Sequence, residues 1–426
     1  FDPAKPPRTL PPPPLPPAPR PDLATDWRSA LSARLRADGM PPMRLAVAGR
    51  ELRLVLAASR HRTLGATAGR AARIAAEHAP EDIAWIVVSL APGGAEIARV
   101  ALLRGDVARA AEGLGSAEEI AFGALLSPAR PLPPAAPDEA LPVFPRFTWS
   151  IEPRLILALM DPDDPLQGEL MAVGGARLAL GAGFSLGGEV GVDLFGTLRG
   201  QPRPADTGLS AVRTDLGAYL DATRTPLLSL TAERIWTLAP DVFARATAGY
   251  LEMMYGGVQG EVLWRPIDRS FAIGAELAWV KQRGYDQAFG FRNYETWTGH
   301  ASLYWDLPYR DLYATIRAGR YLARDWGATI ELGRRFDSGI EVGAFATFTN
   351  AGFDSFGEGS FDKGIFVRFP FDLAGTPSPS RGQLLIRPLI RDGGQRLAVD
   401  SPLYEVTREG RREAFLRGLA GLVPGR

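Results

Sequence analysis

Residues 184–194 read FSLGGEVGVDL, and this stretch decides the fold because residues of the same kind, apolar or polar, recur at every second position. Phe184, Leu186, Val190 and Val192 share one face of an extended chain, while polar and very small residues occupy the other. A period of two is typical of a β-strand whose two faces meet different surroundings. The alternation recurs at 271–279, 312–319 and 340–348. About twelve such segments follow residue 147, each roughly ten residues long, as a tilted membrane-crossing strand requires.

The lengths of the connections between these segments distinguish two kinds of β-protein. Counting strands from 147, the long connections 197–225, 283–293 and 351–363 follow the third, seventh and eleventh strands. Connections after even-numbered strands are short, as at 181–183 and 337–339. Outer-membrane barrels have long loops at one end and tight turns at the other, whereas a water-soluble sandwich does not require this parity. We therefore predict an all-β fold, a transmembrane antiparallel β-barrel of about twelve strands.

Composition narrows the classes of partner and cofactor. The chain has 48 Lys+Arg and 48 Asp+Glu, so its zero net charge argues against a nucleic-acid partner. Cysteine is absent, which excludes disulfides and thiolate metal ligands. Of the three histidines, His61 and His78 have no partner at ligand spacing. The sequence contains no run of eighteen apolar residues, so we expect no transmembrane helix. We expect neither a metal nor a cofactor.

The remaining chain is expected to form a small domain, two linkers and a tail. Proline density marks the linkers. The order of periodic segments in the small domain is αββαββα, with a first helix that Thr25 or Asp26 can cap and a second helix at about 64–78. The first residues, Phe1-Asp2-Pro3, show no initiator Met and no export signal, so we expect the later part of a longer polypeptide. The expected organisation is a Pro-rich linker at 1–24, an α/β periplasmic domain at 25–126, a linker at 127–146, an outer-membrane barrel at 147–390 and a periplasmic tail at 391–426.

His300 and Ser302 raise the alternative of an outer-membrane hydrolase. Two residues apart on a strand, their side chains share a face, so the imidazole could activate the hydroxyl. Ala301, Leu303 and Trp305 form the apolar face, which turns His300 and Ser302 into the lumen, away from a lipid substrate. We therefore expect no catalytic residues here and favour hydrogen bonding within the lumen.

The inward face of the expected barrel carries charges of both signs. They predict either an ion-pair network that closes the lumen or a polar passage for a hydrophilic polymer, with a general diffusion porin as a further alternative. The glycine-rich segment 354–364 is expected at the outer end of the barrel. It either folds inward to lumen charges, meets polymer or a partner, or is a tight loop needed only to close the barrel. The candidate functional residues are Glu276, His300, Arg317, Glu331, Arg335, Glu341, Asp362 and Lys363.

Several runs of this chain resemble the YjbH/GfcD family of outer-membrane exopolysaccharide and group 4 capsule proteins. The runs are MYGGV at 254–258, VKQR at 280–283, TGHA at 298–301, GRYLA at 319–323, GEGSFDKG at 357–364 and RDGG at 391–394. The resemblance covers about residues 145–395, and more weakly the α/β domain. It implies two barrels joined by a periplasmic domain, often with a lipoprotein signal, and it supplies no catalytic residues.

Taken with the barrel, the resemblance predicts a non-enzymatic outer-membrane component of exopolysaccharide or capsule biosynthesis and secretion. The implied partners are outer-membrane lipid, polysaccharide and other exopolysaccharide-secretion proteins.

Overall fold

The computed structural model describes residues 27–61, 63–159, 166–199, 208–352, 361–370, 381–386, 392–400 and 402–418. The chain divides into two compact units. The first comprises residues 1–92, 96–143 and 408–426, and the second comprises 93–95 and 144–407. The predicted helix cap at Thr25 or Asp26 lies outside the described residues.

The first unit is a five-stranded sheet with helices, in the strand order β1-β2-β3-β4-β5. Only β2 and β3 are parallel, and helix α2 is the crossover between them. Its elements are α1 (Trp27–Ala37), β1 (Pro42–Ala48), β2 (Glu51–Leu56), α2 (Leu64–His78), β3 (Trp85–Leu90), β4 (Ala98–Leu103), α3 (Arg104–Ala111), α4 (Ala117–Gly123), β5 (Leu125–Ser127), η4 (Arg408–Gly410) and α7 (Arg412–Arg417). The short helix η1 (Pro92–Gly94) begins in this unit and ends in residues 93–95 of the second.

The core of this unit is apolar. Leu54 on β2, Val88 on β3 and Val100 on β4 are fully buried, and helices α1 and α2 bury Leu35 and Ile74. Helix α2 begins at the cap residue Thr63, whose hydroxyl accepts the N–H of Ala66. The interior is therefore built like that of a water-soluble protein, with apolar residues inside.

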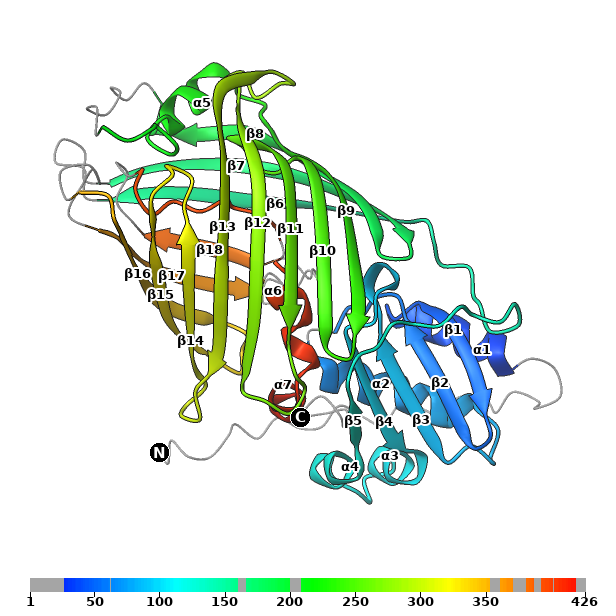
Figure 1. Cartoon of the computed structure of the whole chain (residues 1–426). Helices are drawn as coiled ribbons and strands as arrows, with labels where there is room; N and C mark the ends of the chain where they lie inside the picture. Colours follow the sequence, from blue (N-terminus) through cyan, green and yellow to red (C-terminus); the bar gives the residue numbers. More distant parts are fainter. Residues whose placement is uncertain are drawn as a thin grey trace. The chain divides into compact units, whose positions relative to one another are not determined.

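The second unit is a single antiparallel sheet of 13 strands in sequence order, β6 to β18 (Figure 1). Its first and last strands, β6 and β18, approach within 8 Å between Cα atoms, so the sheet forms a nearly closed barrel. The strands are β6 (Arg146–Leu159), β7 (Leu166–Gly181), β8 (Phe184–Gly196), β9 (Leu227–Ala239), β10 (Val242–Tyr250), β11 (Tyr255–Trp264), β12 (Phe271–Arg283), β13 (Phe291–Asp306), β14 (Leu312–Arg320), β15 (Trp326–Arg335), β16 (Glu341–Thr349), β17 (Asp362–Pro370) and β18 (Arg381–Ile386). The antiparallel barrel predicted from the alternation is confirmed.

Alternation divides the two faces of the barrel as the sequence predicts. Ile151, Leu186, Val190 and Ile330 are exposed on the outer face. Charged and hydroxyl-bearing residues are buried on the inner face, among them Arg245, Glu261, His300, Glu331 and Glu341. The distribution is the inverse of that in the first unit.

Connection lengths follow the predicted parity. The turn between β7 and β8 needs only residues 182–183, where Ala182 and Gly183 both have positive φ, while the connection between β8 and β9 carries helix α5 (Leu216–Ala222). Among the described helices, none is long and apolar enough to cross a membrane.

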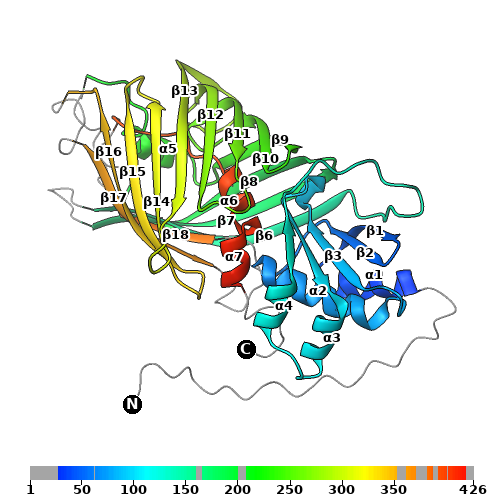
Figure 2. The ribbon, with the colours of Figure 1, turned by 60° about the horizontal axis from the view of Figure 1, so that its bottom comes forward.

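The segment after β18 differs from the expected separate tail. Helix α6 (Leu403–Thr407) belongs to the barrel unit and contacts β10 and β11. Helix α7 belongs to the first unit, where it packs against α2. Figure 2 shows α6 on the inner side of the curved sheet. Residues 392–400 and 402–407 therefore form part of the barrel interior.

Candidate functional site: a polar cavity beside an internal strap

An internal strap, residues 392–400 and 402–407, runs along the inside of the barrel. It begins at Asp392, whose Oδ1 accepts the backbone N–H groups of Val212, Arg213 and Thr214 at 2.8, 2.9 and 3.2 Å. Its Oδ2 accepts the hydroxyl of Thr214 at 2.9 Å. Four donors on one buried carboxylate make a strong anchor, because hydrogen bonds to ionised groups exceed neutral ones in strength. This anchor joins the strap to the long connection between β8 and β9.

The middle of the strap is held by polar groups of the turns between strands. Gly394 donates its N–H to Asp325 at 2.7 Å, and Leu322 donates its N–H to the carbonyl of Gln395 at 2.9 Å. Gly394 has φ +69°, and a Cβ there would lie 2.7 Å from Thr347 Cγ2, so only glycine fits. The strap is therefore fitted closely to the inner wall.

The last part of the strap lies against strands β10 to β13. The Leu403 N–H donates to both carboxylate oxygens of Glu261 at 3.1 Å. Arg245 donates to the carbonyl of Asp400 at 2.9 Å. The rings of Tyr404 and Tyr304 stack with centroids 3.9 Å apart. The strap thus covers one wall of the barrel and leaves the facing wall uncovered.

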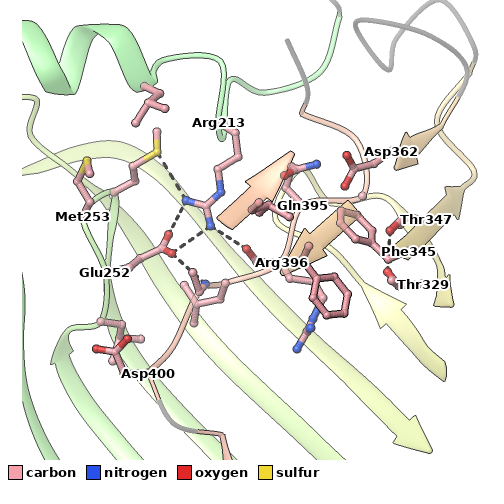
Figure 3. A pocket seen from close by; sticks show the side chains of 18 of the residues that line it. Arg213, Glu252, Met253, Thr329, Phe345, Thr347, Asp362, Gln395, Arg396 and Asp400 are labelled. Atoms are coloured by element: carbon pink, nitrogen blue, oxygen red, sulfur yellow. Dashed lines mark hydrogen bonds and ion pairs between the residues drawn. The ribbon is translucent and has the colours of Figure 1, made fainter. Parts of the chain in front are cut away.

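A cavity of about 500 Å³ remains between the strap and strands β14 to β18, with β6, β8 and β9 at its edge. Figure 3 shows Arg213 and Glu252 beside strap residue Arg396, with Asp362, Phe345 and Thr347 along the wall. Arg213 donates to Glu252 at 2.7 Å and to the carbonyl of Arg396 at 2.7 Å. The charged residues that line the cavity are Arg154, Arg213, Arg317, Arg368, Arg396, Glu189, Glu252, Glu331, Asp362 and Asp400.

The candidate residues Glu276 and His300 pair with each other on adjacent strands. Glu276 Oε1 lies 3.0 Å from His300 Nδ1 and accepts a hydrogen bond from the strap's Arg396 at 3.0 Å. His300 also meets the ring of Tyr321 edge-on at 4.7 Å. These two residues therefore join the wall to the strap.

Four further candidates form one ion-pair chain across β14 to β17. Arg317 pairs with Glu331 at 3.2 Å, and Arg368 lies 3.5 Å from both Glu331 and Glu341. Arg335 lies 3.8 Å from Glu341 and pairs with Asp306 at 2.6 Å. This is the cross-strand network that the inward charges predict, and it lies beside an open volume.

Asp362 and Lys363 lie in strand β17 and not in the expected loop, because pairing with β16 already begins at the register Thr347↔Asp362. Adjacent strand residues face opposite sides, so Asp362 is buried and lines the cavity while Lys363 is exposed on the outer face. They therefore cannot act together on one side of the barrel. Residues 353–360 of the glycine-rich segment lie outside the described residues.

Three inward aromatic rings lie over glycines of the neighbouring strand. A Cβ at Gly364 would lie 2.6 Å from Phe345 Cε1, and one at Gly333 would lie 2.6 Å from Tyr313 Cζ. Phe366 covers Gly343 in the same way. Glycine permits this close approach because it has no side chain, so the rings lie flat along the wall. Phe345 and Phe366 both line the cavity.

The end of the barrel with the long connections is filled by an apolar cluster. Val212 and Tyr219 of the β8–β9 connection pack with Val280 of β12, Leu322 of the β14–β15 turn and Tyr255 of β11. The fully buried Arg283 donates to the carbonyls of Leu227, Glu252 and Gln287, and Tyr219 donates its hydroxyl to the Arg283 carbonyl. The cluster packs the β8–β9 connection against strands β11 and β12 at this end of the barrel.

The hydrolase alternative gains no geometric support. His300 and Ser302 are both buried on the inner face, as their spacing predicts, yet His300 Nδ1 is directed to Glu276. Among the described residues no hydrogen bond joins His300 to Ser302. A survey of the described part of the chain finds no group of three His, Cys, Asp or Glu side chains placed to hold a metal ion.

Sequence reasoning missed the strap and, with it, Arg213, Glu252 and Arg396. The sequence did contain one signal of the strap. The runs that carry the family resemblance include residues that lie where the strap is bound to the barrel. Asp392 and Gly394 belong to the run at 391–394, Leu322 to the run at 319–323, and Asp362 and Gly364 to the run at 357–364.

The fold and the lumen define a class of protein: a β-barrel with an apolar outer face, a charged inner face and its own C-terminal segment inside. The chain belongs to the YjbH family, since the family model described as "Exopolysaccharide biosynthesis protein YbjH" matches residues 2–409. The family resemblance seen in the sequence is thereby confirmed.

Two further similarities accompany the family match. The "Uncharacterized lipoprotein YjbH" of Escherichia coli (strain K12) is 35% identical over 272 residues, which cover 62% of this chain and 39% of that relative. The chain thus spans well under half the length of this relative. Salmonella typhi OmpF, solved in complex with daunomycin, is 10% identical, with 53% of this chain and 86% of that chain covered. Its TM-score of 0.31 is too low to carry an argument.

Proposed function

We propose that this chain is a non-enzymatic outer-membrane component of exopolysaccharide biosynthesis and secretion. The observation that carries the proposal is the barrel of a YjbH family member whose apolar residues face outward and whose charged residues face inward. Only a closed barrel or a helix satisfies its backbone in lipid, and an apolar outer face suits hydrocarbon. In this proposal the long connections face the outside of the cell, and both the α/β unit and the short turns face the periplasm.

We further propose that the strap narrows the lumen of the secretion component. The polar interior suits a hydrophilic polymer, while Asp392, Glu252 and Glu261 hold the strap along the inner wall. A general diffusion porin requires a water-filled channel, so the strap and the apolar cluster disfavour that role. Polysaccharide and other secretion proteins are the proposed partners.

Deletion of the encoding gene in the bacterium that makes the protein tests the role. We expect polymer at the cell surface to fall strongly and to return when the wild-type gene is supplied. Ser302→Ala is expected to restore secretion fully, because a non-enzymatic component does not need this hydroxyl. Unchanged surface polymer after deletion would contradict the role, and failure of Ser302→Ala despite normal folding would favour the hydrolase.

A second test measures whether the hydrogen bonds of Asp392 hold the strap in place. Asp392→Ala removes the acceptor of four hydrogen bonds, so amide exchange across residues 394–403 is expected to accelerate at least tenfold while the strands stay protected. Asp337→Ala, in the exposed turn between β15 and β16, is the matched control. Equal exchange in the two variants would show that the strap does not depend on its anchor.

A further inference from the structure

We propose that a cationic cluster on the outer face of the barrel, formed by Lys281, Arg320 and Arg324, binds the phosphate groups of lipid A. Lipid A is the phosphorylated glycolipid of the outer leaflet in this kind of membrane. The inference rests on the proposed function, because it takes the long connections to face the outside of the cell. It adds a lipid partner and the residues that recognise it.

A row of tryptophans on the outer face marks the depth of the cluster. Trp279 on β12 and Trp297 on β13 are register partners, and Trp326 begins β15 two strands further along the sheet. Trp297 and Trp326 are 53% and 59% exposed. Tryptophan on the outer face of a barrel gathers at the boundary between hydrocarbon and headgroups. We therefore place the lipid headgroups just beyond this row, toward the long connections.

The cationic cluster lies at this row and just beyond it. Lys281 is two residues past Trp279 on the same face of β12. Arg320, the last residue of β14, is the register partner of Trp326, and Arg324 lies in the turn that follows. The three cations therefore lie at the depth of the phosphate groups of the leaflet.

Both guanidiniums are held against strand β13 and keep most of their donors for a ligand. Arg320 Nη1 donates to the carbonyl of Trp297 at 3.1 Å, and Arg324 Nη2 donates to that of Glu295 at 3.0 Å. Residues two apart on a strand are separated by about 7 Å, so the two guanidiniums are neighbours. Neither forms an ion pair with a carboxylate among the described residues. Because a guanidinium carries five N–H donors, phosphate oxygens can accept from each.

The charge of the cluster and the surface below it suit a lipid with phosphate on its headgroup. Within ion-pair distance of the three cations, the described residues supply one carboxylate, Glu295, which is 4.0 Å from Lys281 Nζ. On the other side of the tryptophan row, Leu277 of β12 and Ile316 of β14 are 57% and 42% exposed on the same outer face. Phosphates would meet the cations while acyl chains lie along the apolar strands.

Lipid binding to the full chain in detergent micelles, measured by native mass spectrometry, tests the proposal. The probes are bisphosphorylated lipid A, the same lipid with both phosphates removed, and phosphatidylglycerol. We expect the two comparison lipids to bind at least about tenfold more weakly than lipid A, because they lack its paired phosphates. No binding of lipid A would overturn the inference. Equal binding of the dephosphorylated lipid would show recognition of acyl chains alone, and equal binding of phosphatidylglycerol would show an unselective anionic lipid surface; either result would also overturn it.

Variants on the outer face locate the site. The double variant Arg320→Gln, Arg324→Gln is expected to weaken lipid A binding at least about tenfold through the loss of both guanidiniums. Glu295→Gln is expected to strengthen binding, because it removes the carboxylate beside Lys281. The matched control is Arg334→Gln, since Arg334 is exposed on the outer face of β15 near its opposite end.

Unheated electrophoresis verifies that each variant barrel is folded. Equal affinity of the double variant and the Arg334→Gln protein for lipid A would exclude the cluster as the site.

The two proposals fail in distinguishable ways. Phosphate-dependent lipid A binding without any loss of secretion on gene deletion would remove the proposed secretion role and leave the lipid site. Loss of secretion on deletion, with equal binding of lipid A and its dephosphorylated form, would remove the lipid site and leave the role.

Discussion

The α/β unit and the barrel bury opposite kinds of side chain. In the first unit the buried residues are mainly apolar, among them Leu54, Val88 and Val100. In the barrel, charged residues such as Arg245 and Glu331 are hidden, and Ile151 and Leu186 are exposed. The difference is the one expected if the α/β unit meets water and the barrel meets lipid, as proposed, because burial follows the transfer free energy into the surroundings and not polarity alone. Buried charges of the barrel such as Arg245, Glu261 and Glu331 are met by partners on a neighbouring strand or on the strap.

The largest expected effect is a loss of core volume in the α/β unit. Leu54→Ala deletes a fully buried side chain and is expected to cost about 2–5 kcal/mol of unfolding free energy, through lost transfer energy and the cavity left behind. Leu186→Ala, at an outward position that is 46% exposed, is the barrel counterpart. Amide exchange of β3 and of β8 measures the two effects separately. Similar losses at both positions would contradict the inverted architecture.

A charge on the outer face of the barrel is expected to have the next largest effect. Ile151→Arg places a guanidinium at a position that is 70% exposed and, in a bilayer, near the middle of strand β6. We expect a cost of about 2–4 kcal/mol in lipid vesicles. The control Ser150→Arg faces inward, where the nearby Arg154 side chain is already 41% exposed, so it should cost far less. Denaturant titration in vesicles gives both values, and equal costs would argue against a lipid-facing outer surface.

The smallest expected effect is a loss of stability of the α/β unit as the pH falls. Burial lowers the pKa of His61, and its hydrogen bond to Asp38 at 3.2 Å offsets this only in part. Burial raises the pKa of Asp38, but Arg70, His61 and Arg60 outweigh it, so that this pKa falls below its ordinary value. In both cases the unfolded chain takes up the proton first, so stability falls as the pH drops.

His61 and Asp38 reduce the stability of the α/β unit in different pH ranges. The loss from His61 begins at about pH 6.5 and ends at its lowered folded pKa, and the loss from Asp38 begins at about pH 3.9. His61→Gln should therefore remove the first phase and leave the second. Amide exchange of β2 and β3 at a series of pH values measures both phases. A first phase that survives His61→Gln would show that another group causes it.

The local periodicity of the sequence was sufficient to predict most of the helices and strands. The helix predicted at 64–78 occurs at those residues, with Thr63 as its cap, and the strands of the barrel follow the alternation. Short pieces were missed, namely α4 and β5, because three to seven residues carry too little periodic signal. The inward direction of His300, Arg317, Glu331 and Glu341 was also predictable, since alternation specifies the face of each strand residue.

What the sequence by itself determined is therefore the barrel, its two faces and the side to which each strand residue points, because these follow from a period of two and from connection length. Only the tertiary structure decided that the strap enters the barrel, that Asp392 meets Val212, Arg213 and Thr214, and that Asp362 faces the cavity while Lys363 does not. The physical reason is that the strap has no periodic pattern of its own. Its position comes from hydrogen bonds to residues up to 180 positions away, and such long-range pairing leaves no mark on the local sequence.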